Sequence, residues 1–311
     1  MIKRIVVTGA TSMIASTLID YAVKKNIEIL ALCRKGSTKI NNISKNQKIK
    51  MIFINLNELD NLLVEDEKKY DVFFHFGWDA TMGSGRDDAN LQMANIQYTL
   101  DAVKLAKQLG CHTFVGAGSQ AEYGRTTVQL SDVTPTNPET GYGIAKYTAG
   151  KLSALYAKEL GIKHVWARIL SVYGPRDNEN TLIMYTINKL LDGEVPTFTP
   201  CEQLWDYIHC EDAARAIYLI AERGQDQGIY CIGSGQAQPL SEYLYTIRNE
   251  IDMNLELGIG QRVYGPNQVM YLCADIEKLT QDTGFIPQVN FKEGIIQTIR
   301  YCKNKRRIIN D

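Results

Sequence analysis

Apolar residues follow two alternating spacings along the first half of the chain. Short runs rich in β-branched residues are typical of buried strands, and they lie at 2–8, 27–33, 49–55, 72–77, 113–117 and 164–170. Between them, apolar residues recur at helical spacing over 12–25, 88–109 and 139–160. Strands that alternate with helices predict βαβ units in a parallel sheet covered on both faces.

The alternation becomes less regular after residue 170. The pattern predicts helices near 182–191, 212–222 and 291–301, a strand over 228–232 and a short strand leading to 205–208. A length of 311 residues favours two domains. We therefore predict an α/β fold: a doubly wound parallel sheet over 1–172 with a return segment at about 206–234, and a smaller C-terminal domain over 173–205 and 235–311.

Composition excludes several classes of protein. The 34 basic and 35 acidic residues give a net charge of −1, whereas nucleic-acid binders normally carry a basic excess. The seven cysteines are irregularly spaced and the four histidines are scattered, so we expect free thiols and no metal site. Neither a signal peptide nor a run of 18 apolar residues is evident, which predicts a cytoplasmic protein that does not cross a membrane. The basic run at 303–307 is interpreted as a solvated tail.

A single glycine, Gly9, lies between the first strand and the first helix. A tight turn at this point lets a pyrophosphate lie on the N-terminus of the helix. The usual pattern has glycines at the positions of Ser12 and Ala15 as well, and alanine is tolerated at the latter. The Ser12 hydroxyl could donate to a phosphate, although its Cβ would hold the phosphate farther away. The expected contacts of a dinucleotide in this segment are Gly9, Thr11, Ser12, Met13 and Ile14.

A tyrosine four residues before a lysine occurs five times in the chain, at 21/25, 142/146, 147/151, 185/189 and 301/305. Context selects Tyr142 and Lys146, because they open a predicted helix after the fifth strand and Ser119 lies 23 residues upstream, just beyond that strand. Ligands bind outside the carboxyl ends of parallel strands. A nearby ammonium lowers the pKa of a phenol towards neutrality, and a serine hydroxyl can bind a substrate oxygen. These three residues are the predicted catalytic group.

Taken together, the motifs resemble the extended short-chain dehydrogenase/reductase family. The matching segments are 8–9, 74–77, Asn95, 118–124, 142–146, 168–175, 206–209, Asp212 and 274–275. The resemblance implies an NAD(P)-binding Rossmann domain, a nucleotide-sugar substrate, and a homodimer formed by helices 88–109 and 139–160. It also implies cofactor contacts at Asn55, Leu56, Phe76, Gly77, Trp78, Asn95, Tyr142 and Lys146.

Family members include 4-epimerases, 4,6-dehydratases and 4-ketoreductases. The dehydratases carry Asp-Glu directly after the triad serine or threonine, whereas this chain has Gln120 and Ala121. Segments 202–206, 233–235 and 257–258, with Arg262 and Met270, resemble reductases of the CDP-abequose synthase type. The first expectation is therefore an NADPH-dependent 4-ketoreductase acting on a nucleotide-linked 4-keto-6-deoxyhexose. The alternatives are an NAD-dependent nucleotide-sugar 4-epimerase and a non-catalytic nucleotide-binding protein.

The end of the second strand bears on the choice of cofactor. An acidic residue there selects NAD, because it binds the ribose 2′-hydroxyl and repels a 2′-phosphate. This chain has Arg34 and Lys35 at that point, and a guanidinium suits a phosphate. We expect NADP(H) to be preferred, with NAD(H) possible.

Substrate contacts are harder to predict. Trp205 replaces an arginine that many relatives use near the diphosphate, and Arg262 or Arg86 is expected to compensate. The full set of predicted substrate contacts is Trp78, Arg86, Gln120, Glu122, Ser171, Trp205 and Arg262.

Overall fold

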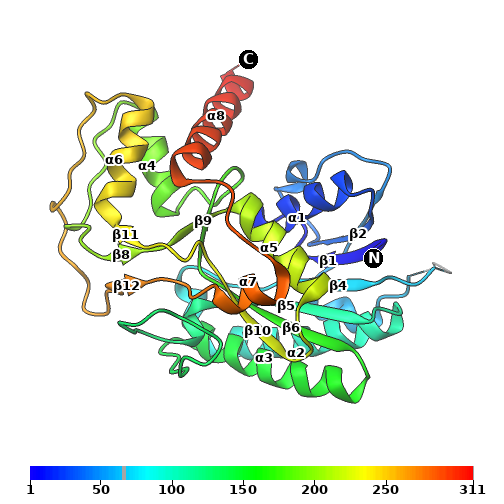
Figure 1. Ribbon diagram of the computed structural model, residues 1–311. Helices are drawn as coiled ribbons and strands as arrows, with labels where there is room; N and C mark the ends of the chain where they lie inside the picture. The colour runs from blue at the N-terminus through cyan, green and yellow to red at the C-terminus, as the bar shows by residue number, and fades with distance from the viewer. Residues whose placement is uncertain (65–67, 311) are drawn as a thin grey trace.

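One parallel sheet organises the computed structural model, which describes residues 1–64 and 68–310 (Figure 1). Its strands are β1 (Arg4–Thr8), β2 (Glu28–Cys33), β3 (Ile49–Phe53), β4 (Val72–His75), β5 (Thr113–Ser119), β6 (Lys163–Ile169) and β10 (Gly228–Ile232). They lie in the order β10-β6-β5-β4-β1-β2-β3, and every neighbouring pair is parallel. The strand order reverses between β1 and β4, which is where ligands bind in such sheets. The predicted doubly wound Rossmann fold is confirmed.

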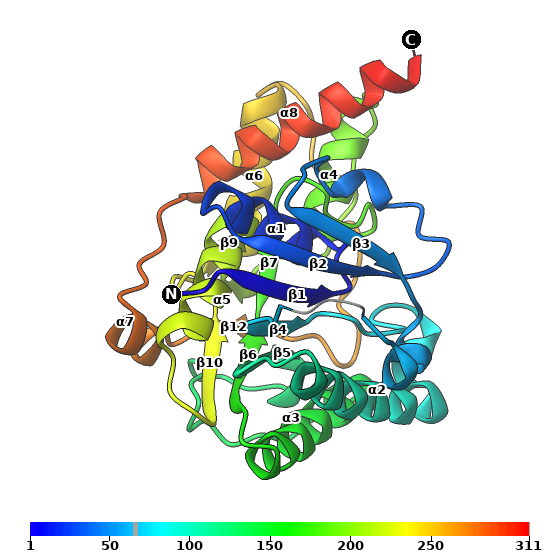
Figure 2. The ribbon, with the colours of Figure 1, turned by 90° about the vertical axis from the view of Figure 1, so that its right-hand side faces the viewer.

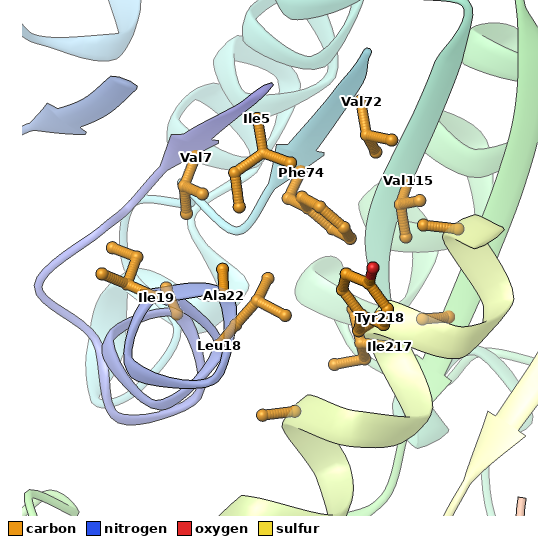
Figure 3. Packing of buried hydrophobic residues seen from close by; sticks show 14 of the residues in the cluster. Ile5, Val7, Leu18, Ile19, Ala22, Val72, Phe74, Val115, Ile217 and Tyr218 are labelled. Carbon is orange, nitrogen blue, oxygen red and sulfur yellow. The ribbon is translucent and has the colours of Figure 1, made fainter. Parts of the chain in front are cut away.

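Helices cover both faces of this sheet (Figure 2). Side chains alternate between the faces along each strand. Ile5 and Val7 of β1 face α1 (Met13–Lys24) and α5 (Cys210–Arg223), as Figure 3 shows. Val6 packs in the second core with α2 (Ala89–Gln108), beside which α3 (Gly141–Glu159) lies. Burial of both faces explains why the strands are almost continuously apolar.

The C-terminal part of the chain builds a separate apolar cluster. It contains α4 (Leu182–Leu191), α6 (Leu240–Ile251) and α8 (Phe291–Asn310). A small sheet lies beside them, in the order β11 (Gln238–Pro239), β8 (Leu204–Trp205), β12 (Tyr271–Leu272). Strand β7 (Ser171–Tyr173) pairs with β9 (Tyr207–His209), and α7 (Glu277–Thr283) packs on α5. The short 3-10 helices are η1 (Ile40–Asn42), η2 (Leu56–Asn61), η3 (Ser84–Asp87) and η4 (Gln120–Glu122). The domain boundaries stay a prediction.

The basic run at 303–307 is mostly exposed, as expected from the sequence, but it is helical rather than a tail. It belongs to α8, and two of its residues hold that helix against the α4 region. Lys305 pairs with Glu179 at 2.7 Å and Arg306 with Asp192 at 2.5 Å. All seven cysteines are buried and unpaired. Among the described residues, no helix combines the length and apolar character that crossing a bilayer requires.

Candidate active site

The three residues predicted to be catalytic meet at the carboxyl end of the sheet. Ser119 ends β5 and is 8% exposed. Tyr142 and Lys146 lie one turn apart near the start of α3, and they are 9% and 4% exposed. Helix α3 begins there because the Thr140 hydroxyl accepts a hydrogen bond from Gly143 N at 3.1 Å. The spacing of four residues therefore directs the phenol and the amine towards the same strand end.

Burial dominates the electrostatics of this group. It raises the pKa of Tyr142, while the hydrogen bond with Ser119 and the charge of Arg86 lower it. Burial also lowers the pKa of Lys146 to about 7. The Lys146 amine donates to the Ala117 carbonyl at 2.7 Å. It lies 3.6 Å from the centre of the Trp78 ring and 5.8 Å from the centre of the Tyr142 ring. The lowering of the Tyr142 pKa by Lys146 stays a prediction, and in this arrangement the amine lies closer to the indole than to the phenol ring.

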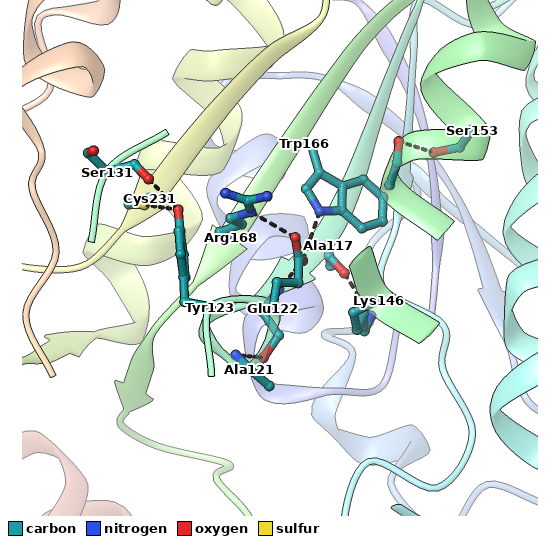
Figure 4. Close-up of polar contacts among 12 residues, drawn as sticks. Ala117, Ala121, Glu122, Tyr123, Ser131, Lys146, Ser153, Trp166, Arg168 and Cys231 are labelled. Carbon is teal, nitrogen blue, oxygen red and sulfur yellow. Dashed lines mark hydrogen bonds and ion pairs between the residues drawn. The ribbon is translucent and has the colours of Figure 1, made fainter. Parts of the chain in front are cut away.

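Glu122 points its carboxylate towards Trp166 and Arg168 of β6 (Figure 4). Its Oε1 accepts from Ser119 N at 2.8 Å and from Trp166 Nε1 at 2.9 Å, and its Oε2 accepts from Arg168 Nε at 2.7 Å. The residue is only 1% exposed. The predicted sugar contact at Glu122 is therefore replaced by a supporting role. Gln120 opens η4 directly after Ser119 and is half-buried.

The turn after β1 fits a dinucleotide. Gly9 has φ +62, and a Cβ there would lie 2.8 Å from Gly77 N, so the turn packs closely on the segment after β4. Ser12 is the N-cap of α1, where its hydroxyl accepts from Ala15 N at 3.4 Å. The exposed cap leaves the first-turn amides of Met13 and Ile14 without intrahelical acceptors, as at any helix start. Such amides favour a phosphate group.

Charges of both signs meet beside β2 and β3. Arg34 is exposed, whereas the Lys35 amine pairs with Glu58 Oε1 at 2.6 Å. Asn55 N donates to the other oxygen of Glu58 at 2.9 Å, in a capping box that a spacing of three residues could have indicated. Sequence reasoning missed Glu58. Nearby, the hydroxyls of Thr11 and Ser37 lie 3.2 Å apart.

The segment after β4 supplies the floor of the site. Leu56 packs against Gly77, and the Phe76 ring lies 6.4 Å from that of Phe74. The Trp78 indole donates to Gln92 at 3.0 Å. Asn95 is 1% exposed, and its side chain binds the N–H and the carbonyl of Asp79 at 2.8 and 3.0 Å. Asn95 therefore holds this segment in place, and its amide is not directed at a cofactor.

A hollow of about 530 Å³ contains two of the predicted substrate contacts, Trp205 and Arg262. The Trp205 indole donates to Ser171 Oγ at 2.8 Å. Ser171 begins β7, two residues after the end of β6, and β6 pairs with the end of β5 that carries Ser119. Arg262 donates to Thr197 Oγ1 at 2.8 Å, beside the Tyr185 ring. Arg86 lies elsewhere, with its guanidinium carbon 4.2 Å from the centre of the Tyr142 ring.

Comparison with known proteins agrees with this geometry. A putative UDP-glucose 4-epimerase of Methanocaldococcus jannaschii is 26% identical over 318 residues, covering 97% of this chain and 99% of the relative. The structure of a UDP-N-acetylglucosamine 4-epimerase from Methanobrevibacter ruminantium M1, in complex with UDP-N-acetylmuramic acid, is similar with a TM-score of 0.88, 22% identity, and coverage of 97% and 99%. A UDP-glucuronic acid 4-epimerase from Bacillus cereus in complex with NAD gives a TM-score of 0.83, 20% identity, and coverage of 97% and 99%.

Residues 5–233 match the model of the NAD dependent epimerase/dehydratase family. The matched range contains the Gly9 turn and all three residues of the candidate catalytic group. The chain is therefore an enzyme that belongs to the NAD dependent epimerase/dehydratase family.

Proposed function

We propose that this enzyme is an NAD-dependent 4-epimerase of a nucleotide sugar. The meeting of Ser119, Tyr142 and Lys146 at the end of β5 carries the proposal, because inversion at C4 needs a proton acceptor beside a bound dinucleotide. The full-length similarity to a putative UDP-glucose 4-epimerase supports the epimerase over the reductase that the sequence favoured. Gln120 and Ala121 supply no acid after Ser119, which argues against a dehydratase.

The residues divide the chemistry between them. Tyr142 takes the proton of the sugar 4-hydroxyl. It later returns a proton to the 4-oxygen of the epimeric product. The Ser119 hydroxyl binds the same oxygen and stabilises its developing charge. NAD, when bound, would supply the reversible hydride transfer at C4 that inversion requires. Lys146 would hold the nicotinamide ribose, and the Gly9 turn would hold the pyrophosphate.

The hollow beside Trp205 is suited to the nucleotide end of the substrate. It combines aromatic rings, including those of Trp205 and Phe198, with the cation of Arg262. Rings offer a face to a base, and a guanidinium suits a diphosphate. The Trp205–Ser171 hydrogen bond connects this hollow to the end of β6, so a sugar on the diphosphate would extend towards Ser119 and Tyr142.

The test is interconversion of C4 epimers. The purified enzyme is incubated with NAD and, separately, UDP-glucose, UDP-N-acetylglucosamine or UDP-glucuronic acid, and the products are separated by anion-exchange chromatography. We expect one substrate to give its C4 epimer without net change in the cofactor. Tyr142→Phe should lower turnover by about 10²–10⁴-fold, the usual contribution of a general acid–base.

Tyr147→Phe is the matched control for that variant. Tyr147 lies on the same helix and is followed by Lys151, whose amine is 5.6 Å from the tyrosine ring, close to the 5.8 Å of the proposed pair. We expect Tyr147→Phe to retain turnover. Equal activity of the two variants would show that Tyr142 is not the acid–base.

An NADPH-dependent 4-ketoreductase is the second candidate, favoured by the exposed Arg34 after β2. Isothermal titration with NADH and NADPH, for wild type and Arg34→Ala, distinguishes the two. A reductase requires NADPH to bind more tightly than NADH, and Arg34→Ala should remove that preference. Similar affinities that the mutation leaves unchanged would eliminate this candidate's main support.

We also propose a homodimer formed through α2 and α3. These helices pack side by side and present exposed apolar side chains, of which Met93 and Leu155 are each 67% exposed. On α2, Ala102 and Leu105 face this chain's own core, whereas Leu91 is 45% exposed. Sedimentation equilibrium should give twice the 35.0 kDa chain mass, and a monomer mass would contradict the dimer.

A further inference from the structure

A second cation lies closer to Tyr142 than Lys146 does. The Arg86 guanidinium carbon is 4.2 Å from the centre of the Tyr142 ring, whereas the Lys146 amine is 5.8 Å from it. Lys146 is engaged on its other side by the Trp78 ring and by the Ala117 carbonyl. Arg86 is therefore the nearest cation on the face of the phenol among the described residues.

The segment that carries Arg86 is fixed from several directions. Arg86 Nη1 donates to the Thr81 carbonyl at 2.8 Å. The neighbouring Asp87 carboxylate accepts from Gly141 N, the first residue of α3, at 2.8 Å. The Gln92 amide of α2 donates to Gly85 O at 3.0 Å. These contacts hold η3 against the start of the helix that carries Tyr142 and so place the Arg86 guanidinium beside the ring.

The charges around Tyr142 come from three elements. Arg86 of η3 favours the phenolate, and Glu122 of η4 opposes it. Lys146 is on Tyr142's own helix, and burial lowers its pKa to about 7, which disfavours its charged form. A guanidinium remains protonated at any pH the protein tolerates. The Asp87 carboxylate also lies on η3, where it binds Gly141 N.

We propose that Arg86 is a positioning residue for catalysis, which stacks on Tyr142 and supplies the constant positive charge that favours its phenolate. The inference rests on the proposed acid–base role of Tyr142. It differs from the expectation that Arg86 binds the substrate diphosphate. Stacking on the ring restrains the phenol, and the fixed charge makes proton removal from the sugar hydroxyl easier at neutral pH.

Titration of Tyr142 tests the proposal without a substrate. The whole protein is labelled with ¹³Cζ-tyrosine, and the Tyr142 resonance is assigned as the one missing from Tyr142→Phe. An opposite charge close to a titrating group changes its pKa by about 1–3 pH units, so we expect Arg86→Gln to raise the midpoint of Tyr142 by about one pH unit or more. Arg86→Lys should keep part of the effect. Arg125→Gln, which alters an exposed arginine paired with Glu139, should leave the midpoint unchanged.

The same midpoint in Arg86→Gln and wild type would overturn the proposal. If burial keeps Tyr142 protonated up to about pH 11 in both proteins, the comparison passes to the acid limb of kcat, and the same limb in both proteins would overturn the proposal. Circular dichroism of each variant, compared with wild type, identifies any loss of folding. If Arg86→Gln does not fold, Arg86→Lys decides: replacing the stacked guanidinium by an ammonium should raise the midpoint by less than about one pH unit, and a midpoint equal to that of wild type opposes the proposal.

Kinetics with UDP-glucose and NAD separate the two roles of Arg86. For a positioning residue, Arg86→Gln moves the acid limb of kcat to higher pH, lowers kcat about tenfold at neutral pH if the Tyr142 midpoint rises by about one pH unit, and leaves KM nearly unchanged. A raised KM with an unchanged pH profile would assign Arg86 to the diphosphate and overturn the proposal. If wild type does not epimerise UDP-glucose, the proposed function fails for that sugar, while the tyrosine titration still decides the role of Arg86.

Discussion

Replacing Glu122 with glutamine tests the buried network that holds Ser119. The carboxylate accepts three hydrogen bonds, from Ser119 N, Trp166 Nε1 and Arg168 Nε. Glutamine has nearly the same shape, but its terminal nitrogen is a donor. That nitrogen must face either Arg168 or the other two N–H groups. At least one buried donor therefore loses its acceptor, and the guanidinium loses its counter-charge.

The burial of the pair sets the magnitude. The side chains of Glu122 and Arg168 are 1% and 3% exposed, so water cannot replace the lost acceptor. On the side of β5 there is no spare room, because a Cβ on Gly118 would lie 2.5 Å from Glu122 Oε1. Removing one partner of a buried ion pair typically costs about 3–5 kcal/mol. We expect Glu122→Gln to lower the free energy of unfolding by about this amount.

Urea unfolding followed by circular dichroism measures the loss. The midpoint should fall with little change in slope, because the surface exposed on unfolding stays similar. Glu139→Gln is the matched control: its partner Arg125 lies 2.8 Å away, and the two side chains are 36% and 45% exposed. Screening by solvent makes such pairs weak, so the control should unfold close to wild type.

Two results would refute the reasoning. A loss below about 1 kcal/mol would place the pair among exposed ones and contradict its burial. Full stability with a raised KM for the sugar nucleotide would return Glu122 to the substrate contact expected from the sequence. If the network is correct, Glu122→Gln with Arg168→Met should be more stable than Glu122→Gln alone, because the uncompensated charge is removed.

Three further changes have defined outcomes. Gly9→Ala should lower stability by about 1–2 kcal/mol, because φ is +62 and the new Cβ would meet Gly77 N; thermal unfolding and NAD titration check this. Ser12→Gly should tighten NAD binding in isothermal titration while costing only a few tenths of a kcal/mol of stability. Burial lowers the pKa of Lys146 to about 7, so between that value and about 10.4 the unfolded chain binds more protons and stability rises with pH. Lys146→Met should therefore gain most over wild type below about pH 7 in urea unfolding, and the gain should fade towards about pH 10.

Local periodicity was enough to predict the sheet and much of its surroundings. Helix α4 and strand β10 have the predicted limits, because a run of buried apolar residues begins and ends there. The predicted end of α8 was wrong by nine residues (301 against 310). Its last turns are polar, and they are held by ion pairs such as that of Lys305 with Glu179, 126 positions away.

The candidate site was predictable where one strand end and one helix start supply it. Ser119, Tyr142 and Lys146 belong to that class. Glu122 was misassigned because nothing in its neighbourhood indicates Arg168, which lies 46 positions away on the next strand. Two oppositely charged residues that are brought together only because their strands are neighbours in the sheet have no characteristic spacing in the sequence.

The choice between epimerase and reductase depends on the cofactor loop, since both reactions use the same acid–base group. An epimerase regenerates its NAD, while a net reduction consumes NADPH, whose 2′-phosphate needs free cations. The sequence offers Arg34 and Lys35 at that position. The fold, however, brings Glu58 from the segment after β3 to within 2.6 Å of Lys35, and a carboxylate there repels a 2′-phosphate. Of the two predicted cations, only Arg34 is then without a carboxylate partner beside it in the described residues. The loop therefore favours NADPH less than its two basic residues suggest. This agrees with an enzyme that keeps NAD and inverts its substrate.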